Sequence, residues 1–155
     1  MVRISRWLNI ILLQGVGFTV SQVWRQLTGQ QSFKRYPVVI GGTKQWIMGR
    51  VGTSDAGIYD QVFKRMEYSC VNSLELIPIS IIDAGANVGY STLYFRKCFP
   101  ESKIVSFEPD DDNFIMLVRN TAVLKNTVTV KGAVWGETCT LSMANEPFRG
   151  GSACA

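Results

Sequence analysis

The chain has 155 residues, enough for one domain with a buried core, or for one domain and an arm. Hydrophobic side chains make up 46% of it and charged ones 18%, a balance that excludes a disordered, collagen-like or low-complexity chain. The net charge of +4 is too small to indicate a nucleic-acid partner, so none is predicted.

Residues 1–36 are predicted to form a basic and apolar arm. The first 50 residues carry seven basic side chains and no carboxylate, whereas the rest of the chain carries nine basic and twelve acidic side chains. Residues 7–24 are uncharged and follow Arg3 and Arg6, but polar side chains interrupt the run, so a membrane-spanning helix is not expected. We predict an apolar helix that packs against the body of the protein. The alternative is a helix on a membrane surface, with contact through residues 1–35.

Residues 37–77 are predicted to form a hairpin followed by a helix. Two short apolar runs flank Gly41-Gly42, a pair typical of a tight turn. The expected strands are Val38–Ile40 and Gln45–Met48. Apolar residues then recur at helical spacing from Ile58 to Met66, and Ser54 or Asp55 is placed to cap that helix.

Residues 78–155 alternate between short apolar runs and amphipathic segments. The expected elements are a strand at 79–82, a helix at 90–98, a strand at 103–107, a helix that Asp110 caps, a strand at 128–135 and a hairpin arm at 138–143. The buried face expected for the second helix consists of Phe114, Leu117, Val118, Thr121 and Leu124. The order strand, helix, strand, helix, strand indicates a parallel sheet with right-handed crossovers. We therefore predict an α/β fold, namely part of a doubly wound parallel sheet, preceded by the hairpin and the N-terminal helix.

The predicted ligand site lies where the first two strands of this sheet end. Asp83 opens a turn that has glycine at positions 85 and 89, and the helix that follows points its free N–H groups at the same crevice. Glu108 ends the second strand, where a carboxylate can accept hydrogen bonds from both hydroxyls of a ribose. The turn does not match the G-x-G-x-x-G pattern of dinucleotide sites, and Asp83 would repel a pyrophosphate. The ammonium and sulfonium groups of S-adenosylmethionine (SAM) both favour a nearby carboxylate, so Asp83 fits that cofactor.

At these positions the sequence resembles the FkbM-type SAM-dependent methyltransferases. The motifs that carry the resemblance are Ile82–Leu93, Phe107-Glu108-Pro109, Asn113-Phe114, and upstream Val51–Gly57 with Gln61-Val62-Phe63. The likeness covers about residues 37–150. It implies a class I methyltransferase fold, SAM as cofactor, and O-methylation of a hydroxyl on a sugar, a glycan or another small molecule.

The resemblance also assigns roles to residues. It implies that Asp83, Gly85, Ala86, Asn87 and Gly89 hold the methionine end of SAM. It implies that Glu108 holds the ribose and that Asn113 supports the loop of Glu108. The family pattern continues with a fourth strand that ends in Lys-x-Asp-x-Glu-Gly, which does not occur before Ala155. We therefore expect residues 78–155 to be the N-terminal half of a SAM-binding core, truncated after its third strand.

Other interpretations of single residues stay open. The sequence has no histidine, so a catalytic base would be a carboxylate, and Asp55 is the candidate; a helix cap explains Asp55 equally well. No metal site is predicted, because no two cysteines have metal-binding spacing and Asp110, Asp111 and Asp112 are typical of a helix start.

Two other functions compete with methyl transfer. One is a non-catalytic SAM-binding or membrane-peripheral module, and the other is a nicotinamide-dependent oxidoreductase. The expected location is cytoplasmic, with the membrane periphery as the alternative, because no cleavage site of the A-x-A kind follows the apolar run. An incomplete sheet exposes an edge strand, so oligomerisation through that edge is also expected.

Overall fold

The computed structural model describes residues 29–75 and 77–137. The elements, in chain order, are β1 (Phe33–Ile40), β2 (Thr43–Arg50), α3 (Asp55–Tyr59), the π-helical turn η1 (Asp60–Lys64), the 3₁₀ turn η2 (Ser69–Ser73), β3 (Ser80–Ala84), α4 (Tyr90–Cys98), β4 (Lys103–Glu108), α5 (Asp111–Thr121) and β5 (Thr127–Lys131).

The hairpin is confirmed, and its strands are longer than predicted. Strands β1 and β2 pair antiparallel from Phe33↔Arg50 to Ile40↔Thr43. The turn residues Gly41 and Gly42 have φ of 56° and 77°, a conformation that glycine adopts without a steric penalty. The predicted strand began at Val38, but β1 begins at Phe33, so residues 33–36 of the predicted arm belong to the hairpin. The helix expected at residues 7–24 lies outside the described residues.

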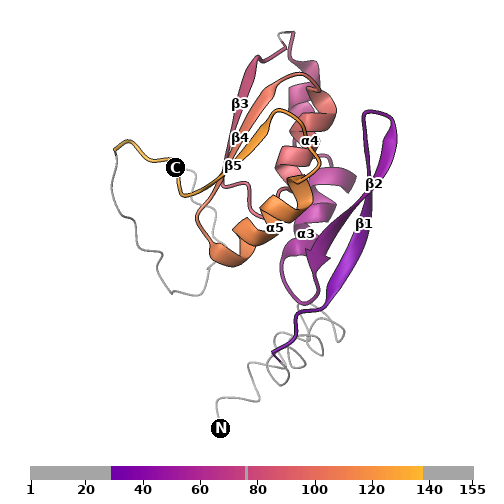
Figure 1. The fold of residues 1–155 in the computed structure, drawn as a ribbon. Helices are drawn as coiled ribbons and strands as arrows, with labels where there is room; N and C mark the ends of the chain where they lie inside the picture. The colour runs from indigo at the N-terminus through magenta and orange to yellow at the C-terminus, as the bar shows by residue number, and fades with distance from the viewer. Residues whose placement is uncertain (1–28, 76, 138–155) are drawn as a thin grey trace.

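The parallel sheet is confirmed. Strands β3, β4 and β5 are adjacent in that order, with Ile82, Val105 and Val128 in one row. Helix α4 connects β3 to β4 and α5 connects β4 to β5, as the alternating pattern predicted. Both helices lie on the same side of the sheet (Figure 1). The carboxyl ends of β3 and β4 therefore lie side by side, which is where such sheets bind ligands.

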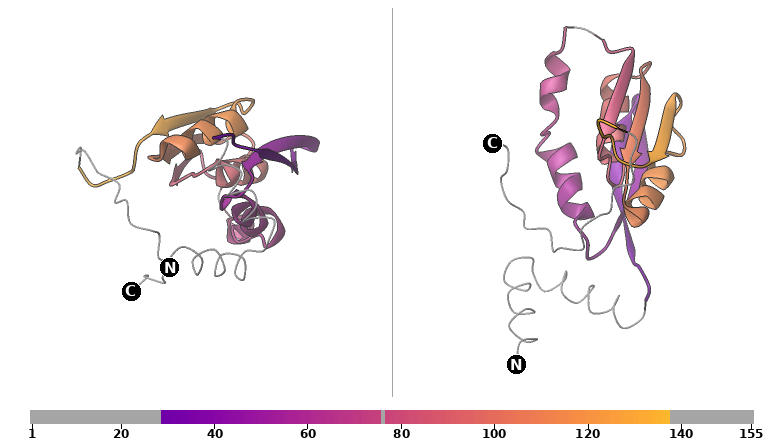
Figure 2. Two further views of the ribbon diagram at one scale, coloured as in Figure 1. Left: turned by 90° about the horizontal axis from the view of Figure 1, so that it is seen from below. Right: turned by 90° about the vertical axis from the view of Figure 1, so that its left-hand side faces the viewer.

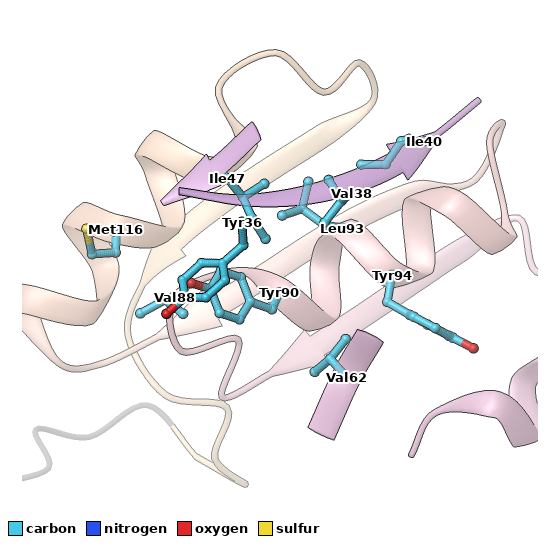
Figure 3. Close-up of a cluster of buried hydrophobic side chains, with 10 residues drawn as sticks. All are labelled: Tyr36, Val38, Ile40, Ile47, Val62, Val88, Tyr90, Leu93, Tyr94 and Met116. Carbon is cyan, nitrogen blue, oxygen red and sulfur yellow. The ribbon is translucent and has the colours of Figure 1, made fainter. Parts of the chain in front are cut away.

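The hairpin packs on the other side of α4 and α5, so the two helices separate the hairpin from the sheet (Figure 1). Buried side chains of the hairpin, η1, the turn after β3, α4 and α5 form one hydrophobic cluster, drawn in Figure 3. Its buried members are Tyr36, Val38, Ile40, Ile47, Val62, Val88, Tyr90, Leu93, Tyr94 and Met116. The Tyr90 hydroxyl, inside this cluster, donates a hydrogen bond of 3.0 Å to the Met48 carbonyl, so the only polar atom of this buried side chain is satisfied. The hairpin is thus part of the core that supports the turn after β3.

Three predicted elements differ from the structure. The helix expected through Met66 is α-helical only to Tyr59 and continues as η1, and Ser54 makes no side-chain cap. The strand expected to reach Trp135 ends at Lys131, and the arm predicted at 138–143 lies outside the described residues. Helix α5 buries Leu117 and Thr121 as predicted, but it also buries Met116 and Asn120, and it exposes Val118, which was expected in the core. The buried stripe is rotated because α5 contacts the hairpin as well as the sheet.

The second face of the parallel sheet is open among the described residues. Ile82 and Val128 on that face are 67% and 47% exposed. The right-hand view of Figure 2 looks onto the sheet from the side away from the hairpin. Within residues 29–75 and 77–137, no helix has the length and apolar character needed to cross a membrane.

Candidate functional site

The turn after β3 is held against the end of β4 by backbone hydrogen bonds. The amides of Gly85 and Ala86 both donate to the Phe107 carbonyl, at 3.0 and 2.9 Å. Gly85, Asn87 and Gly89 have φ of 80°, 50° and 88°, so three of these five consecutive residues have a left-handed backbone conformation. The predicted turn residues are therefore brought together at the carboxyl ends of β3 and β4.

Glycine is required at position 89 for a second reason. A Cβ atom there would lie 3.0 Å from Leu117 Cδ1 and 3.2 Å from Thr121 Cγ2, because α5 passes directly beside the turn. At Gly85 a Cβ atom would meet nothing within 4 Å. Gly89 thus permits close packing of the turn on a helix, whereas Gly85 leaves open space beside the end of β3.

Glu108 joins the two loops of the site. Its Oε2 accepts from the Asn87 amide at 2.8 Å, and its Oε1 accepts from the Asp110 amide at 2.9 Å. The side chain is 5% exposed. Each carboxylate oxygen has two lone pairs, so each can accept one further hydrogen bond from a ligand. The structure therefore places Glu108 beside the turn, as the sequence predicted, and gives it a bridging role that the sequence did not indicate.

Asp83 is buried below the turn and faces the first residues of α4. Its Oδ2 accepts from the Ser91 hydroxyl at 2.9 Å and from the Thr92 hydroxyl at 2.6 Å. Burial raises the pKa of Asp83, and the nearby charge of Glu108 raises it further, while the two hydroxyls act in the opposite direction. A positively charged group beside Asp83 would offset this penalty on its charged form.

Asn87 presents a buried acceptor with no partner. No hydrogen bond reaches its Oδ1 from any residue that the structure describes. Buried polar atoms in folded proteins nearly always have a hydrogen-bond partner, so an orphan at a ligand-binding turn indicates a place for a donor group of a ligand.

Asn113 lies in the first turn of α5. The predicted cap of this helix is confirmed, because Asp110 Oδ1 accepts from the Asn113 amide at 2.9 Å. The Asn113 side chain is directed elsewhere, since its Oδ1 accepts from Arg50 Nη2 at 2.6 Å. Asn113 therefore connects the Glu108 loop to the hairpin.

Asp55 neither caps a helix nor presents a free carboxylate, because Arg50 binds both of its oxygens. Arg50 donates to it three times, from the backbone amide (2.8 Å) and Nε (3.0 Å) to Oδ2 and from Nη2 (2.9 Å) to Oδ1. The side chain is fully buried and caps no helix. A carboxylate enclosed in this way cannot reach a substrate, so Asp55 is not retained as the catalytic base.

Two structural residues were missed from the sequence. Arg50 binds both Asp55 and Asn113, and Asn120 hydrogen-bonds Met48 and Val88. Neither Arg50 nor Asn120 lies in a local sequence pattern that would mark it as important. Among residues 29–75 and 77–137, no group of three or more His, Cys, Asp or Glu side chains is arranged to hold a metal ion.

No family model matches the sequence. A solved SAM-dependent methyltransferase from Agrobacterium tumefaciens superposes with a TM-score of 0.43 and 11% identity, over 62% of this chain and 31% of that one. A fibrillarin from Aeropyrum pernix with natively bound SAM gives a TM-score of 0.40 and 13% identity, over 68% and 44% of the two chains.

Two curated proteins match parts of the sequence. The chain is 39% identical over 66 residues to methyltransferase sdnD of Sordaria araneosa, covering 43% of this chain and 25% of that protein. It is 45% identical over 40 residues to methyltransferase 1 of Beauveria bassiana, covering 26% and 16%. The matched part of this chain thus spans a quarter or less of each relative, and over that part it is similar to two proteins named as methyltransferases.

Proposed function

We propose that this chain is the cofactor-binding part of a SAM-dependent methyltransferase with the class I fold, of the FkbM type. The proposed acceptor is a hydroxyl group on a sugar or another small molecule. The observation that carries the proposal is the group of hydrogen-bond acceptors at the ends of β3 and β4. This group consists of the buried carboxylates of Asp83 and Glu108 and the unpartnered Oδ1 of Asn87.

These acceptors fit SAM and oppose a dinucleotide. The ribose of SAM offers two hydroxyl donors, its amino-acid end offers an ammonium, and its sulfonium is a second positive charge. A pyrophosphate offers only acceptors and negative charge, which Asp83 and Glu108 would repel. The open space beside Gly85 leaves room for a ligand next to the backbone of the turn. The described residues therefore fit SAM as the group they would hold.

The part of this chain in the reaction is to bind and orient. SAM, when bound, supplies a methyl group attached to a positively charged sulfur. Glu108 would hold the ribose hydroxyls, while Asn87 and the turn would hold the amino-acid end. Holding two reactants in alignment can lower a barrier by roughly 7–11 kcal/mol. The buried carboxylates of Asp55, Asp83 and Glu108 already accept hydrogen bonds, so we assign them to structure and binding and not to proton transfer.

Two observations support this proposal. The partial matches to two named methyltransferases support methyl transfer. The FkbM type and the hydroxyl acceptor are supported only by the motifs around Asp83 and Glu108. A nicotinamide-dependent oxidoreductase remains the competing outcome of the test.

Isothermal titration of the 155-residue chain with S-adenosylhomocysteine and with NADH tests the proposal. Glu108→Gln removes the charge and one acceptor while preserving shape, and charged hydrogen bonds are worth about 1.5–3 kcal/mol each. It should therefore weaken S-adenosylhomocysteine binding about tenfold or more. Asp111→Ala is the control, because Asp111 is exposed and its ion pair among the described residues is with Lys131. Binding of NADH without S-adenosylhomocysteine, or unchanged affinity in Glu108→Gln, would refute the proposal.

A further inference from the structure

Arg50 makes a contact that its ion pair with Asp55 does not require. The Nε and Nη2 groups of Arg50 already bind both oxygens of Asp55, at 3.0 and 2.9 Å. The second hydrogen of Nη2 is directed across to α5, where it binds Asn113 Oδ1 at 2.6 Å. The Arg50 side chain is 12% exposed. Burial alone would lower the pKa of Arg50, but the hydrogen bonds and charge of Asp55 outweigh burial and raise it, so the guanidinium is charged.

A continuous series of hydrogen bonds leads from this guanidinium to Glu108. The Asn113 amide donates to Asp110 Oδ1 at 2.9 Å, and the Asp110 amide donates to Glu108 Oε1 at 2.9 Å. The other oxygen of Glu108 accepts from the Asn87 amide. Every residue in the series between Arg50 and Glu108 belongs to the loop after β4 or to the first turn of α5. The orientation of the Glu108 carboxylate is therefore linked to the hairpin.

We propose that Arg50 is a positioning residue for the cofactor, acting through Asn113 to fix the loop that orients Glu108. This inference rests on the proposed function of Glu108 as the ribose ligand. Asp55 has a supporting part, since its two oxygens fix the plane of the guanidinium and so direct Nη2 at Asn113. The segment that contains Arg50 and Asp55, which precedes the parallel sheet in sequence, would thereby control cofactor affinity without touching the cofactor.

The geometry separates this role from a merely structural one. A structural role needs a positive charge beside the buried Asp55, and lysine supplies a charge. The positioning role needs a planar fork with a third donor aimed at α5, which lysine cannot supply while it holds Asp55. Arg50→Lys should therefore weaken cofactor binding even where the chain stays folded.

Asn113 offers a matched pair of variants. Asn113→Leu has a similar volume but no acceptor for Nη2. Asn113→Asp keeps an acceptor, strengthens the bond to Arg50 by charge, and places a carboxylate in the first turn of a helix, where it is favourable. Loss of affinity in Asn113→Leu and its retention in Asn113→Asp would identify the hydrogen bond itself as the cause.

The test is calorimetric titration of these three variants with S-adenosylhomocysteine, with near-UV circular dichroism as the check of folding. Arg50→Lys and Asn113→Leu should weaken binding about fivefold or more, and Asn113→Asp should stay within about twofold of the wild type. The inference is overturned if Arg50→Lys binds like the wild type or if Asn113→Asp is as weak as Asn113→Leu. If Arg50→Lys does not fold, the two Asn113 variants decide alone.

Failure of this inference is distinguishable from failure of the proposed function. If the wild-type chain does not bind S-adenosylhomocysteine, or if Glu108→Gln does not change its affinity, both the proposed function and the positioning role are refuted. If Glu108→Gln weakens binding while Asn113→Leu does not, only the positioning role of Arg50 is refuted.

Discussion

Asn120 in the last turn of α5 should be one of the most sensitive positions for stability. Its Oδ1 accepts from the Met48 amide at 2.9 Å, and its Nδ2 donates to the carbonyls of Met48 and Val88 at 2.9 and 2.8 Å. One buried amide thus joins the hairpin, α5 and the turn after β3. Asn120→Ala removes all three bonds.

The magnitude follows from which groups lose their partner. The Met48 carbonyl keeps the Tyr90 hydroxyl at 3.0 Å, so it stays satisfied. The Met48 amide loses its acceptor and the Val88 carbonyl loses its donor, and leaving a buried polar group unpaired costs about 1–3 kcal/mol. We therefore expect Asn120→Ala to lower the free energy of unfolding by about 3 kcal/mol, a large part of the roughly 5–15 kcal/mol typical of a domain.

Urea unfolding followed by far-UV circular dichroism measures this change. Thr121→Val is the matched control, because in the described part of the chain the Thr121 hydroxyl donates to the Leu117 carbonyl of the same helix. That control should cost less than about 1 kcal/mol. The reasoning is refuted if Asn120→Ala is no more destabilising than Thr121→Val, since the hairpin would then be held without this amide.

Three further outcomes are expected. Gly89→Ala should lower the melting temperature more than Gly85→Ala, because both positions have positive φ but only Gly89 faces Leu117; equal losses would contradict the packing argument. Burial raises the pKa of Asp83, so its contribution to stability is greatest below its unfolded pKa and is lost as pH rises through its folded pKa. As pH rises, the free energy of unfolding of Asp83→Asn should therefore increase relative to that of the wild type, which urea titrations at several pH values measure. The variant should also bind S-adenosylhomocysteine more weakly. A difference in stability that does not change with pH would contradict this. Ile82→Lys on the edge strand β3 should reduce self-association in size-exclusion chromatography, and an unchanged elution profile would contradict the association expected through that edge.

Local sequence patterns were sufficient for the elements that position the site. Helix α4 has the predicted bounds, because Tyr90 follows the glycine turn and Pro100 follows its end. The Asp110 cap was predicted from residue type alone and is confirmed by its bond to the Asn113 amide. These features depend on contacts between residues close in the chain, which a single sequence displays directly.

The buried face of α5 shows where such patterns are insufficient. Hydropathy favoured Val118 for the core and gave no reason to place Asn120 there. The structure reverses these two positions, because backbone groups of β2 and of the turn satisfy the Asn120 amide in the interior. A polar side chain can be buried when its partners are supplied from elsewhere in the chain, and a local window does not contain those partners.

Arg50 and Asp55 illustrate the same limit for function. In sequence, Asp55 was an isolated carboxylate that could be interpreted as a helix cap or as a catalytic base. Both interpretations assumed a free carboxylate, but Arg50 occupies both oxygens and then reaches Asn113, 63 positions further along the chain. The hydrogen bond from Asn120 to Met48 spans 72 positions. Two residues of β2, Arg50 and Met48, thus contact the first and the last turn of α5. The contact of Arg50 belongs to the series of hydrogen bonds that leads to Glu108. The position of the turn could be predicted because glycine and carboxylate residues mark it in sequence. The support that fixes its geometry comes from a hairpin whose polar contacts become visible only when the chain is folded.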